Sequence, residues 1–235
     1  MLTVAMPTLT VENYLKTILQ LESPLDNGER SSVSTGEIAR ALGVAPGTAT
    51  SMMKALESEG LVRYRPYAGV SLRPKGRNLA LHVLRRHRIV ELFLVEILGM
   101  DWSEVHEEAE HLEHAVSDRV LDRLDHLLGH PTVDPHGDPI PLASGELPRG
   151  NLVLLTEKRP GDRCVIARLL DQSVGFLEIA ETRRLVPGAE IIVQAHSPEL
   201  DVVEIRVGSQ AITLSIDVAA KIAVRASAQR RRSKT

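Results

Sequence analysis

The chain has few of the residues that cross-link secreted proteins or span membranes. It contains one cysteine, Cys164, and 3% aromatic residues among 235. A single cysteine excludes an intrachain disulfide framework and a cysteine-rich zinc site, and we expect Cys164 to be a small buried side chain in a strand. No apolar run approaches the roughly 18 residues of a membrane-spanning helix, and no basic stretch precedes an apolar segment at the N-terminus. These features predict a cytoplasmic protein without membrane contact.

Charge is distributed unevenly along the chain. Residues 28–90 contain eleven Lys and Arg against four Asp and Glu, a net of +7, whereas residues 91–140 contain two against thirteen, a net of −11. The formal net charge of −3 conceals this division. A basic segment beside an acidic one favours a nucleic-acid-binding face next to a cation-binding or interaction segment. With 43% hydrophobic residues, the length suffices for two or three small domains.

The N-terminal third has the pattern of a helix-turn-helix. Apolar residues at helical spacing predict a first helix over residues 9–22. The sequence Ser-Thr-Gly-Glu at 34–37 is typical of a helix start, and that short helix should end at Gly43. After a turn at residues 44–47, a second helix should continue to about Gly60. A short helix, a Gly-containing turn and a second helix form the helix-turn-helix signature.

A β-hairpin wing should follow. Residues 61–65 and 70–72 are β-prone, and Pro, Tyr, Ala and Gly at 66–69 predict the turn between them. The start of a recognition helix faces base edges, and neighbouring basic residues contact phosphates. The alternative is that Thr48 is only a helix cap and that the arginines are only a solvated surface. The candidate DNA-binding residues are Thr35, Pro46, Thr48, Thr50, Ser51, Lys54, Arg63, Arg65 and Lys75.

Long helices are predicted next. A helix from about Arg77 to Leu98 should be broken by Gly99, and another should run from Ser103 to about Asp118, with the apolar period continuing beyond it. These helices carry more apolar surface than a monomer of this size needs. We therefore expect a helical dimer interface.

The C-terminal part has a different pattern. Residues 129–150 are dense in Pro and Gly and predict a linker or an extended crossing. Residues 229–235 contain four basic residues and should form a disordered, solvated tail, with phosphate contact as the alternative. Short β-branched runs between these segments indicate a small barrel. The runs are 152–155, 164–169, 190–195, 202–207, 211–216 and 223–225.

Histidines and carboxylates are concentrated in the acidic segment, because eight of nine histidines lie between His82 and His136. Positions i, i+4, i+7 and i+8 of a helix lie close to one face, and imidazole and carboxylate donors suit first-row divalent metals. A solvated polar face is the alternative, but six candidates on two helices favour metal binding. Four of them have the spacing given above: His106, Glu110, Glu113 and His114. The other two, His87 and Glu91, form an i, i+4 pair one helix earlier.

Two other function classes compete with a metal-dependent DNA-binding protein. The sequence His106-Glu107-x-x-Glu110 resembles the His-Glu-x-x-His element of zinc hydrolases. It lacks the second histidine, and the chain has no lid or nucleophile pattern, so we predict that it is not an enzyme. A metal-independent winged-helix protein would explain the basic segment but would leave the ligand stripe without a role.

In this order, the motifs resemble those of the diphtheria toxin repressor and manganese transport regulator family over residues 8–225. The most specific stretches are Arg86-His87-Arg88 with Glu91, and residues 105–114 followed by Ser117-Asp118. The resemblance implies a mainly α chain with a small β domain. Its expected parts are a winged helix-turn-helix DNA-binding domain at 8–76, a helical metal-binding and dimerisation domain at 77–141, a linker at 142–150, an SH3-like (FeoA-like) β barrel at 151–226 and a disordered basic tail at 227–235.

The resemblance also implies a homodimeric, metal-dependent repressor of metal homeostasis genes, with two metal ions per subunit and a pseudo-palindromic operator in double-stranded DNA. One site would combine Glu110, Glu113 and His114 with a first-helix residue, Asn13 or its neighbour Glu12. The other would combine His87, Glu91 and His106 with Asp171 or Gln172 of the barrel.

The residues at two positions bear on which metal the chain binds. Family members place Met or Asp where this chain has Asn13, which leaves an amide carbonyl as the donor. Position 110 is Cys in the iron-responsive branch and Glu in the manganese-responsive branch, and this chain has Glu110. A carboxylate is a hard donor that suits manganese. We therefore predict Mn²⁺ as the effector, with Fe²⁺ as the alternative.

Overall fold

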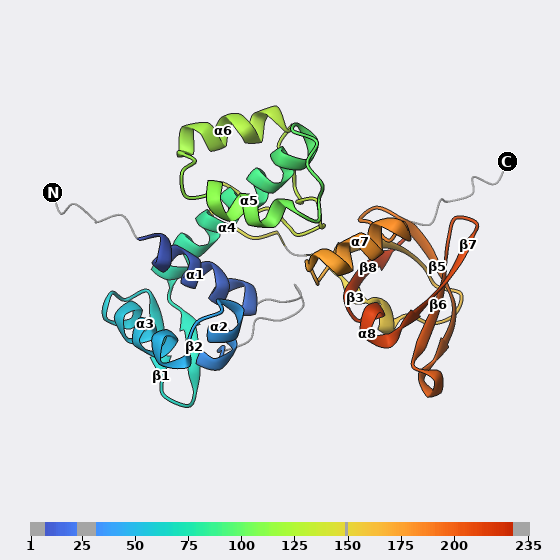
Figure 1. Cartoon of the computed structure of the whole chain (residues 1–235), viewed down its shortest axis with the longest axis horizontal. Helices are drawn as coiled ribbons and strands as arrows, with labels where there is room; N and C mark the ends of the chain where they lie inside the picture. The colour runs from blue at the N-terminus through green and yellow to red at the C-terminus, as the bar shows by residue number, and fades with distance from the viewer. Residues whose placement is uncertain (1–7, 23–31, 149, 228–235) are drawn as a thin grey trace.

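The computed structural model describes residues 8–22, 32–148 and 150–227. It has three parts: a winged domain, a helical part beside it, and a β domain reached through an extended segment (Figure 1). The tail expected at 227–235 falls outside the described residues except for Ser227. No helix within the described residues is both long and apolar enough to cross a membrane.

The winged domain has the predicted helix-turn-helix and hairpin. Its elements are α1 (Leu9–Glu22), α2 (Thr35–Ala41), α3 (Pro46–Ser58), β1 (Val62–Arg65) and β2 (Gly69–Leu72). Ser34 caps α2 in a capping box with Glu37, as its sequence indicated. The strands pair antiparallel, with Arg63 opposite Ser71. Buried residues of α1, α2, α3 and the hairpin share one apolar core.

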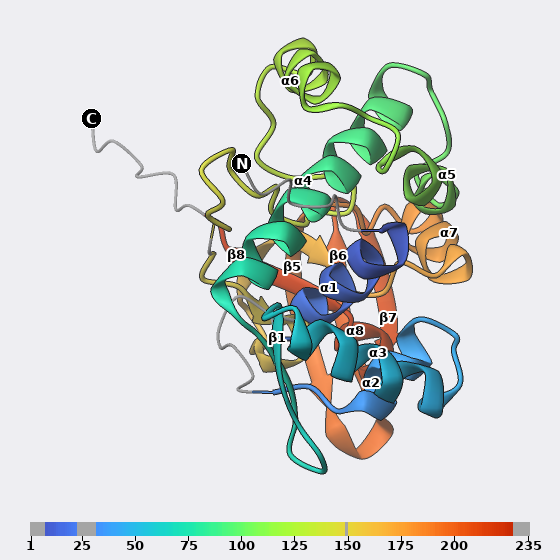
Figure 2. The ribbon, with the colours of Figure 1, turned by 90° about the vertical axis from the view of Figure 1, so that its left-hand side faces the viewer.

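The helical part is built on α4 (Pro74–Glu96), which runs from the wing toward α5 (Val105–Leu112) and α6 (Asp118–Leu127) (Figure 2). The expectation of a single helix from 103 to 118 was wrong. The helix α5 ends at Leu112, and a new helix begins after Ser117, whose side chain accepts a hydrogen bond from the Val120 N–H at 3.4 Å. A residue that caps a new N-terminus has extended backbone, so one continuous helix cannot pass through it.

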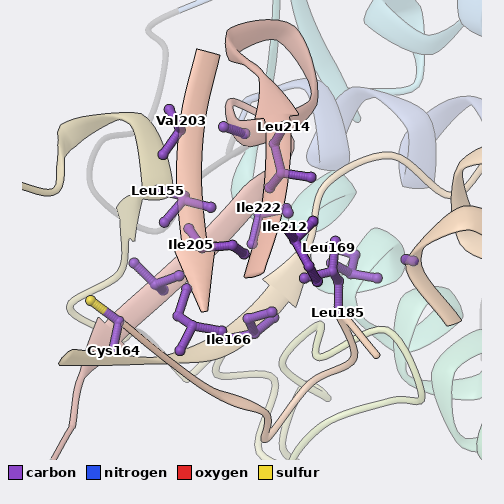
Figure 3. Packing of buried hydrophobic residues seen from close by; sticks show 14 of the residues in the cluster. Leu155, Cys164, Ile166, Leu169, Leu185, Val203, Ile205, Ile212, Leu214 and Ile222 are labelled. Atoms are coloured by element: carbon purple, nitrogen blue, oxygen red, sulfur yellow. The ribbon is translucent and has the colours of Figure 1, made fainter. Parts of the chain in front are cut away.

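The β domain is a six-stranded antiparallel sheet in the order β3-β8-β4-β5-β6-β7, which confirms the predicted small SH3-like barrel. Its apolar core includes Cys164, which is 1% exposed (Figure 3). Burial raises the pKa of this thiol. The elements are β3 (Val153–Leu154), η1 (Leu155–Glu157), β4 (Arg163–Leu169), α7 (Val174–Thr182), β5 (Glu190–Ser197), η2 (Pro198–Leu200), β6 (Val202–Val207), β7 (Gln210–Ser215), α8 (Ile216–Ala219) and β8 (Ile222–Ala226).

Sequence patterns missed α7, which packs Phe176 and Leu177 into the barrel core. They also described residues 129–150 only as a linker or crossing. The described part of that segment contains one isolated β-bridge, Val133 to Pro139, but much of it is buried. A backbone hydrogen bond joins it to the barrel, from the Leu169 N–H to the His136 carbonyl at 2.9 Å. The segment is therefore a packed junction between the helical part and the barrel.

Candidate metal centre

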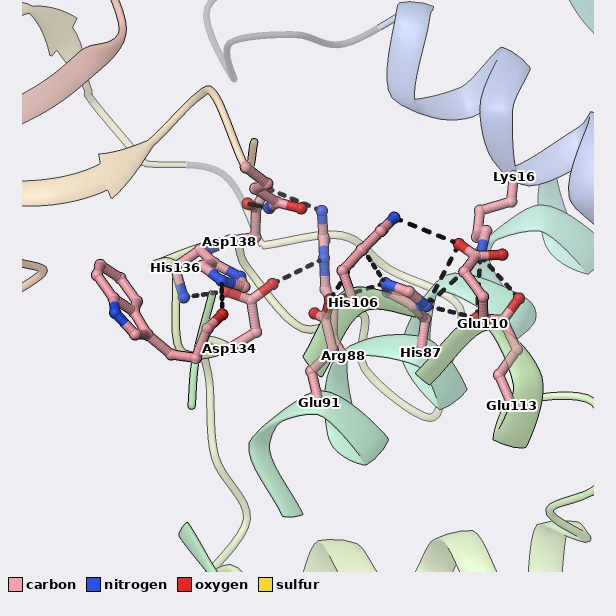
Figure 4. A network of polar contacts seen from close by, with 12 residues as sticks. Lys16, His87, Arg88, Glu91, His106, Glu110, Glu113, Asp134, His136 and Asp138 are labelled. Atoms are coloured by element: carbon pink, nitrogen blue, oxygen red, sulfur yellow. Dashed lines mark hydrogen bonds and ion pairs between the residues drawn. The ribbon is translucent and has the colours of Figure 1, made fainter. Parts of the chain in front are cut away.

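The first donor group lies between α4 and α5. His87 and Glu91 come from α4, and His106 and Glu110 come from α5 (Figure 4). Donor atoms of His87, His106 and Glu110 all lie within 4.8 Å of one another. The Glu91 Oε1 lies 2.9 Å from His87 Nε2 and 3.1 Å from His106 Nδ1. The i, i+4 spacing on each helix has thus placed these side chains where the two helices face each other.

A second donor group joins α1 to the turn after α5. The His114 Nδ1 lies 2.7 Å from Glu12 Oε2, and its Nε2 lies 2.8 Å from Asn13 Oδ1. Glu113, which is fully buried, places Oε1 3.3 Å from the same Nε2. The structure therefore brings Glu12 and Asn13 to His114, as the family resemblance implied. We call the two donor groups together the helical cluster.

Burial and charge act in opposite directions on His87. Burial opposes its charged form, but the carboxylates of Glu91 and Glu113 outweigh burial and raise the pKa of His87 to about 9. For Glu91 and Glu113, burial again opposes charge, and contacts with His87 hold the pKa of both carboxyls below the usual range. At neutral pH the cluster therefore contains a charged imidazole among ionised carboxylates. A bound metal would replace that proton, because only the neutral ring is a ligand.

Sequence patterns missed Lys16 of α1, whose side chain is 4% exposed. Its Nζ lies 2.6 Å from Glu110 Oε1 and 2.7 Å from Glu113 Oε1, inside the helical cluster (Figure 4). The available signal was its i, i+3 spacing from Asn13, which places both residues on one face of α1. That spacing alone does not identify the face that meets the carboxylates.

A third donor group lies where the helical part meets the barrel. The carboxylates of Glu91 and Asp134 and a ring nitrogen of His136 lie within 4.8 Å of one another, and all three residues are buried. We call them the junction cluster. Sequence patterns missed Asp134 and His136, because residues 129–150 have no period that places side chains on one face.

His136 has the hydrogen bonding expected of a metal ligand. Its Nε2 lies 2.9 Å from the Trp102 carbonyl oxygen and therefore donates to it. The Nδ1 is buried and has no hydrogen-bond partner within the described part of the chain. A ligating histidine typically donates its other ring N–H to a carbonyl, which fixes the tautomer. This orphaned acceptor, beside two carboxylates, shows that the residues present fit a divalent metal.

The surroundings of Asp134 oppose its ionisation. Burial, followed by the nearby charges of Asp138 and Glu91, raises the pKa of Asp134 well above its usual range. The Asp134 Oδ1 accepts hydrogen bonds from the His136 and Asp138 backbone N–H groups, each at 2.9 Å. The turn at 134–138 therefore holds the carboxyl in place. A bound cation would favour its ionised form.

The barrel contributes to the wall of this centre. A cavity of about 260 Å³ is lined by His87, Glu91 and Asp134 from the helical side and by Gln172 from the barrel side. The Gln172 Nε2 donates to Asp138 Oδ2 at 2.9 Å. The other barrel candidate does not join the donors, because the Asp171 carboxylate pairs with Lys221 at 2.7 Å. The structure thus gives no support to Asp171 as a ligand.

The first turns of α3 expose short polar side chains and one lysine. Thr48, Ser51 and Lys54 are exposed. The alternative role of Thr48 as a helix cap is wrong, because Ala45 occupies the N-cap position. The Ser51 hydroxyl donates to the Gly47 carbonyl at 2.9 Å. Pro46 is likewise exposed, whereas Thr50 is half-buried and its hydroxyl donates to the Pro46 carbonyl at 2.9 Å.

The wing and its flanks expose basic residues. Arg63 and Arg65 on β1 and Lys75 at the start of α4 are exposed, and Thr35 is half-buried in the first turn of α2. Sequence patterns did not single out Tyr67, at the tip of the wing, which is fully exposed with a φ of 64°. An exposed aromatic ring at a wing tip is a further candidate for nucleic-acid contact.

Comparison with known proteins identifies the family. Residues 6–70 match the family described as "Iron dependent repressor, N-terminal DNA binding domain". Residues 73–142 match "Iron dependent repressor, metal binding and dimerisation domain", and residues 153–226 match "FeoA domain". The chain belongs to the iron-dependent repressor family. Members of this family, which includes the diphtheria toxin repressor, are metal-dependent transcriptional repressors, and so is this chain.

The names of the repressor's relatives refer to different metals. The iron-dependent repressor IdeR of Mycobacterium tuberculosis is 33% identical over 92% of this chain and 96% of its own length. A solved manganese-dependent transcriptional repressor in complex with manganese has a TM-score of 0.85 at 35% identity, covering 92% of this chain and all of that one. The IdeR structure of T. acidophilum has a TM-score of 0.76 at 26% identity, covering 94% and 100%.

Proposed function

We propose that this repressor is activated by Mn²⁺, with Fe²⁺ as the second candidate, and that each subunit binds two metal ions. The observation that carries the metal assignment is the carboxylate of Glu110 beside His87 and His106. Oxygen donors favour manganese relative to the softer metals that thiolates select. Relatives named for either metal resemble the chain to a similar degree, so the donor chemistry supports the choice.

One ion would bind in the helical cluster and the other in the junction cluster. The helical ion would draw on Glu110, Glu113 and His114, with Asn13 and Glu12 from α1 and with His87 and His106 as neighbouring donors. The junction ion would draw on Glu91, Asp134 and His136. A divalent ion supplies bonds between segments far apart in the sequence.

Those bonds would control the position of the DNA-binding domain. The helix α1 shares a core with α2 and α3, so a link from α1 to Glu113 and His114 ties the recognition helix to the helical part. In a two-fold dimer the recognition helices must reach successive major grooves, roughly 34 Å apart. Fixing their separation removes an ordering cost from DNA binding.

The proposed dimer interface lies on the helical part. Apolar side chains with 40–59% exposure lie on α5, on α6 and directly after α4, and exposed apolar surface of this kind is available for an interface. They are Ile97, Leu98, Leu112, Val120 and Leu127. We propose a homodimer that binds a pseudo-palindromic site, with α3 at base edges and the basic residues of the wing at phosphates. We propose no catalytic role for the chain.

DNA binding by the full-length protein tests this function. A labelled duplex would be selected from a random pool in Mn²⁺ and, separately, in chelator, and binding would be followed by fluorescence anisotropy. We expect binding in Mn²⁺ and weaker binding in anaerobic Fe²⁺. In chelator the affinity for DNA should fall at least a hundredfold, because near-complete switching requires the metal to favour the DNA-competent state by about 5 kcal/mol. Glu110→Ala should abolish the metal response, whereas Glu108→Ala, an exposed neighbour on α5, should keep it.

Equal binding in Mn²⁺ and in chelator would contradict a metal-gated repressor and favour a metal-independent winged-helix protein. Stronger activation by Fe²⁺ than by Mn²⁺ would keep the repressor and reject the manganese assignment.

A further inference from the structure

Lys16 places a positive charge where the donor groups of the helical cluster meet. Its Nζ lies 2.6 Å from Glu110 Oε1 and 2.7 and 2.9 Å from the two oxygens of Glu113. It also lies 3.5 Å from His87 Nδ1. The residue is 3% exposed, so bulk water contributes little to its solvation. Most of the interactions of this ammonium group are therefore with atoms that serve as candidate metal donors.

The ammonium group stabilises two carboxylates that would otherwise repel each other. Glu113 is fully buried, and the Glu110 side chain is 30% exposed. Burying ionised carboxylates without a partner is costly, and removing one partner of a buried ion pair exposes that cost. Lys16 therefore supplies compensating charge, together with the His87 ring. Because it comes from α1, the same contact joins the winged domain to α5.

A metal ion and this ammonium group exclude each other. Divalent ions of this size bond carboxylate oxygens at about 2.0–2.2 Å. Lys16 Nζ already lies within 2.9 Å of three such oxygens, so an ion bonded to them would lie next to another positive charge. Repulsion between like charges is strong in a poorly solvated site. Metal binding at Glu110 and Glu113 must displace Lys16.

We propose that Lys16 is a tethered cation that competes with the metal for Glu110 and Glu113 and thereby sets the metal concentration at which the repressor responds. This inference rests on the proposed function of the helical cluster. Metal binding becomes an exchange of one α1–α5 link for another: an ion pair through Lys16 gives way to metal bonds through the donors of Glu12 and Asn13. The net affinity is lower than the donor set alone would give.

Mn²⁺ titration of the full-length protein without DNA, by isothermal calorimetry, tests the proposal. Lys16→Met removes the charge and keeps a chain of similar length. We expect its Kd for the helical ion to be lower by about tenfold or more, with the junction ion unaffected. In chelator its Tm should fall, because Glu110 and Glu113 lose the Lys16 ammonium group and keep the His87 ring as their cationic partner. In saturating Mn²⁺ most of that Tm difference should disappear.

The matched control is Lys158→Met, which removes a lysine charge from the barrel. It should change neither Kd nor the response of the Tm to Mn²⁺. Lys16→Gln is a second neutral variant that keeps hydrogen bonds to the carboxylates and protects the test against misfolding of Lys16→Met. Wild-type protein gives a further measurement: amine acetylation of Lys16, read by mass spectrometry, should increase when Mn²⁺ displaces the side chain.

Unchanged or weaker Mn²⁺ binding by both folded variants would overturn competition, as would equal acetylation of Lys16 with and without bound Mn²⁺. Failure of the wild-type protein to bind Mn²⁺ at all would instead overturn the proposed function. The two failures are therefore distinguishable.

Discussion

The helical cluster and the junction cluster use similar donors in different surroundings. In the helical cluster, the side chains of His106 and Glu110 are 46% and 30% exposed. In the junction cluster, Glu91, Asp134 and His136 are 1%, 4% and 0% exposed. The helical cluster contains its own cation, Lys16. In the junction cluster, the buried Arg88 places Nε 3.5 Å from Asp134 Oδ2, and burial still raises the pKa of Asp134 well above its usual range.

This difference indicates a division of roles. A partly exposed site whose donors are held by a displaceable side chain can exchange metal with solvent, which a sensor requires. An ion bound in the fully buried junction cluster would exchange slowly and would stabilise the junction between helices and barrel. Glu91 belongs to both, because its carboxylate contacts His87 and His106 on one side and lies with Asp134 and His136 on the other.

The largest effect should come from breaking both clusters at once with Glu91→Gln. The change removes the buried carboxylate that lies 2.9 Å from His87 Nε2. The free energy of unfolding in chelator should fall by about 3–5 kcal/mol, and both metal equivalents should weaken. Urea denaturation and metal titration measure these quantities. Glu96→Gln, an exposed change on the same helix, is the control. If Glu91→Gln still bound two equivalents of metal with unchanged affinity, Glu91 would not be shared by the two clusters.

A smaller loss of stability should follow from Gly137→Ala, which disturbs only the junction. Gly137 has a φ of +87°, and a Cβ there would lie 2.0 Å from the Ala167 carbonyl oxygen of the barrel. We expect a destabilisation of about 3 kcal/mol with selective loss of the junction ion. Gly145→Ala is closely matched, with a φ of +84° and, among the described residues, no atom within 4 Å of the added Cβ. It should cost only about 1–2 kcal/mol. Equal losses in thermal unfolding would contradict a tight helix–barrel contact at Gly137.

The charge on His87 predicts how stability depends on pH. Its pKa of about 9 in the folded protein lies above the usual 6.5, so its contribution is complete below pH 6.5 and is lost as the pH rises through 9. In chelator, the free energy of unfolding should therefore decrease between pH 6.5 and 9. His87→Asn should remove most of this slope. Urea denaturation at five pH values provides the measurement, and an unchanged slope in the variant would assign the dependence to other groups.

The smallest effect should be a change of metal preference by Glu110→Cys. A thiolate is a softer donor, so the helical ion should shift from Mn²⁺ toward Fe²⁺, Co²⁺ or Zn²⁺ by about tenfold in relative affinity. Glu108→Cys, which is exposed on the same helix, should leave the preference unchanged. Competitive titrations of both variants measure the ratio. Identical selectivity would mean that Glu110 does not set the choice of metal.

The sequence alone determined the elements whose signals are local. The capping box at Ser34 and the apolar period of α1 placed helices correctly, and short β-branched runs located the strands of the barrel. The i, i+4 pairs on α4 and α5 identified most of the helical cluster, because a helix carries such residues on one face whatever it packs against. The end of α5 escaped prediction, since a capping serine and the apolar period gave competing signals.

Only the tertiary structure decided which of these faces meet. Lys16 lies 94 residues from Glu110 and 97 from Glu113 in the chain, and its contacts with them depend on how α1 and α5 each pack against α4. Asp134 and His136 lie in a segment rich in Pro and Gly, where no period relates a residue to its neighbours. Their approach to Glu91 depends on the close contact of Gly137 with the barrel. Periodicity describes one element at a time, whereas a metal centre requires donors from several.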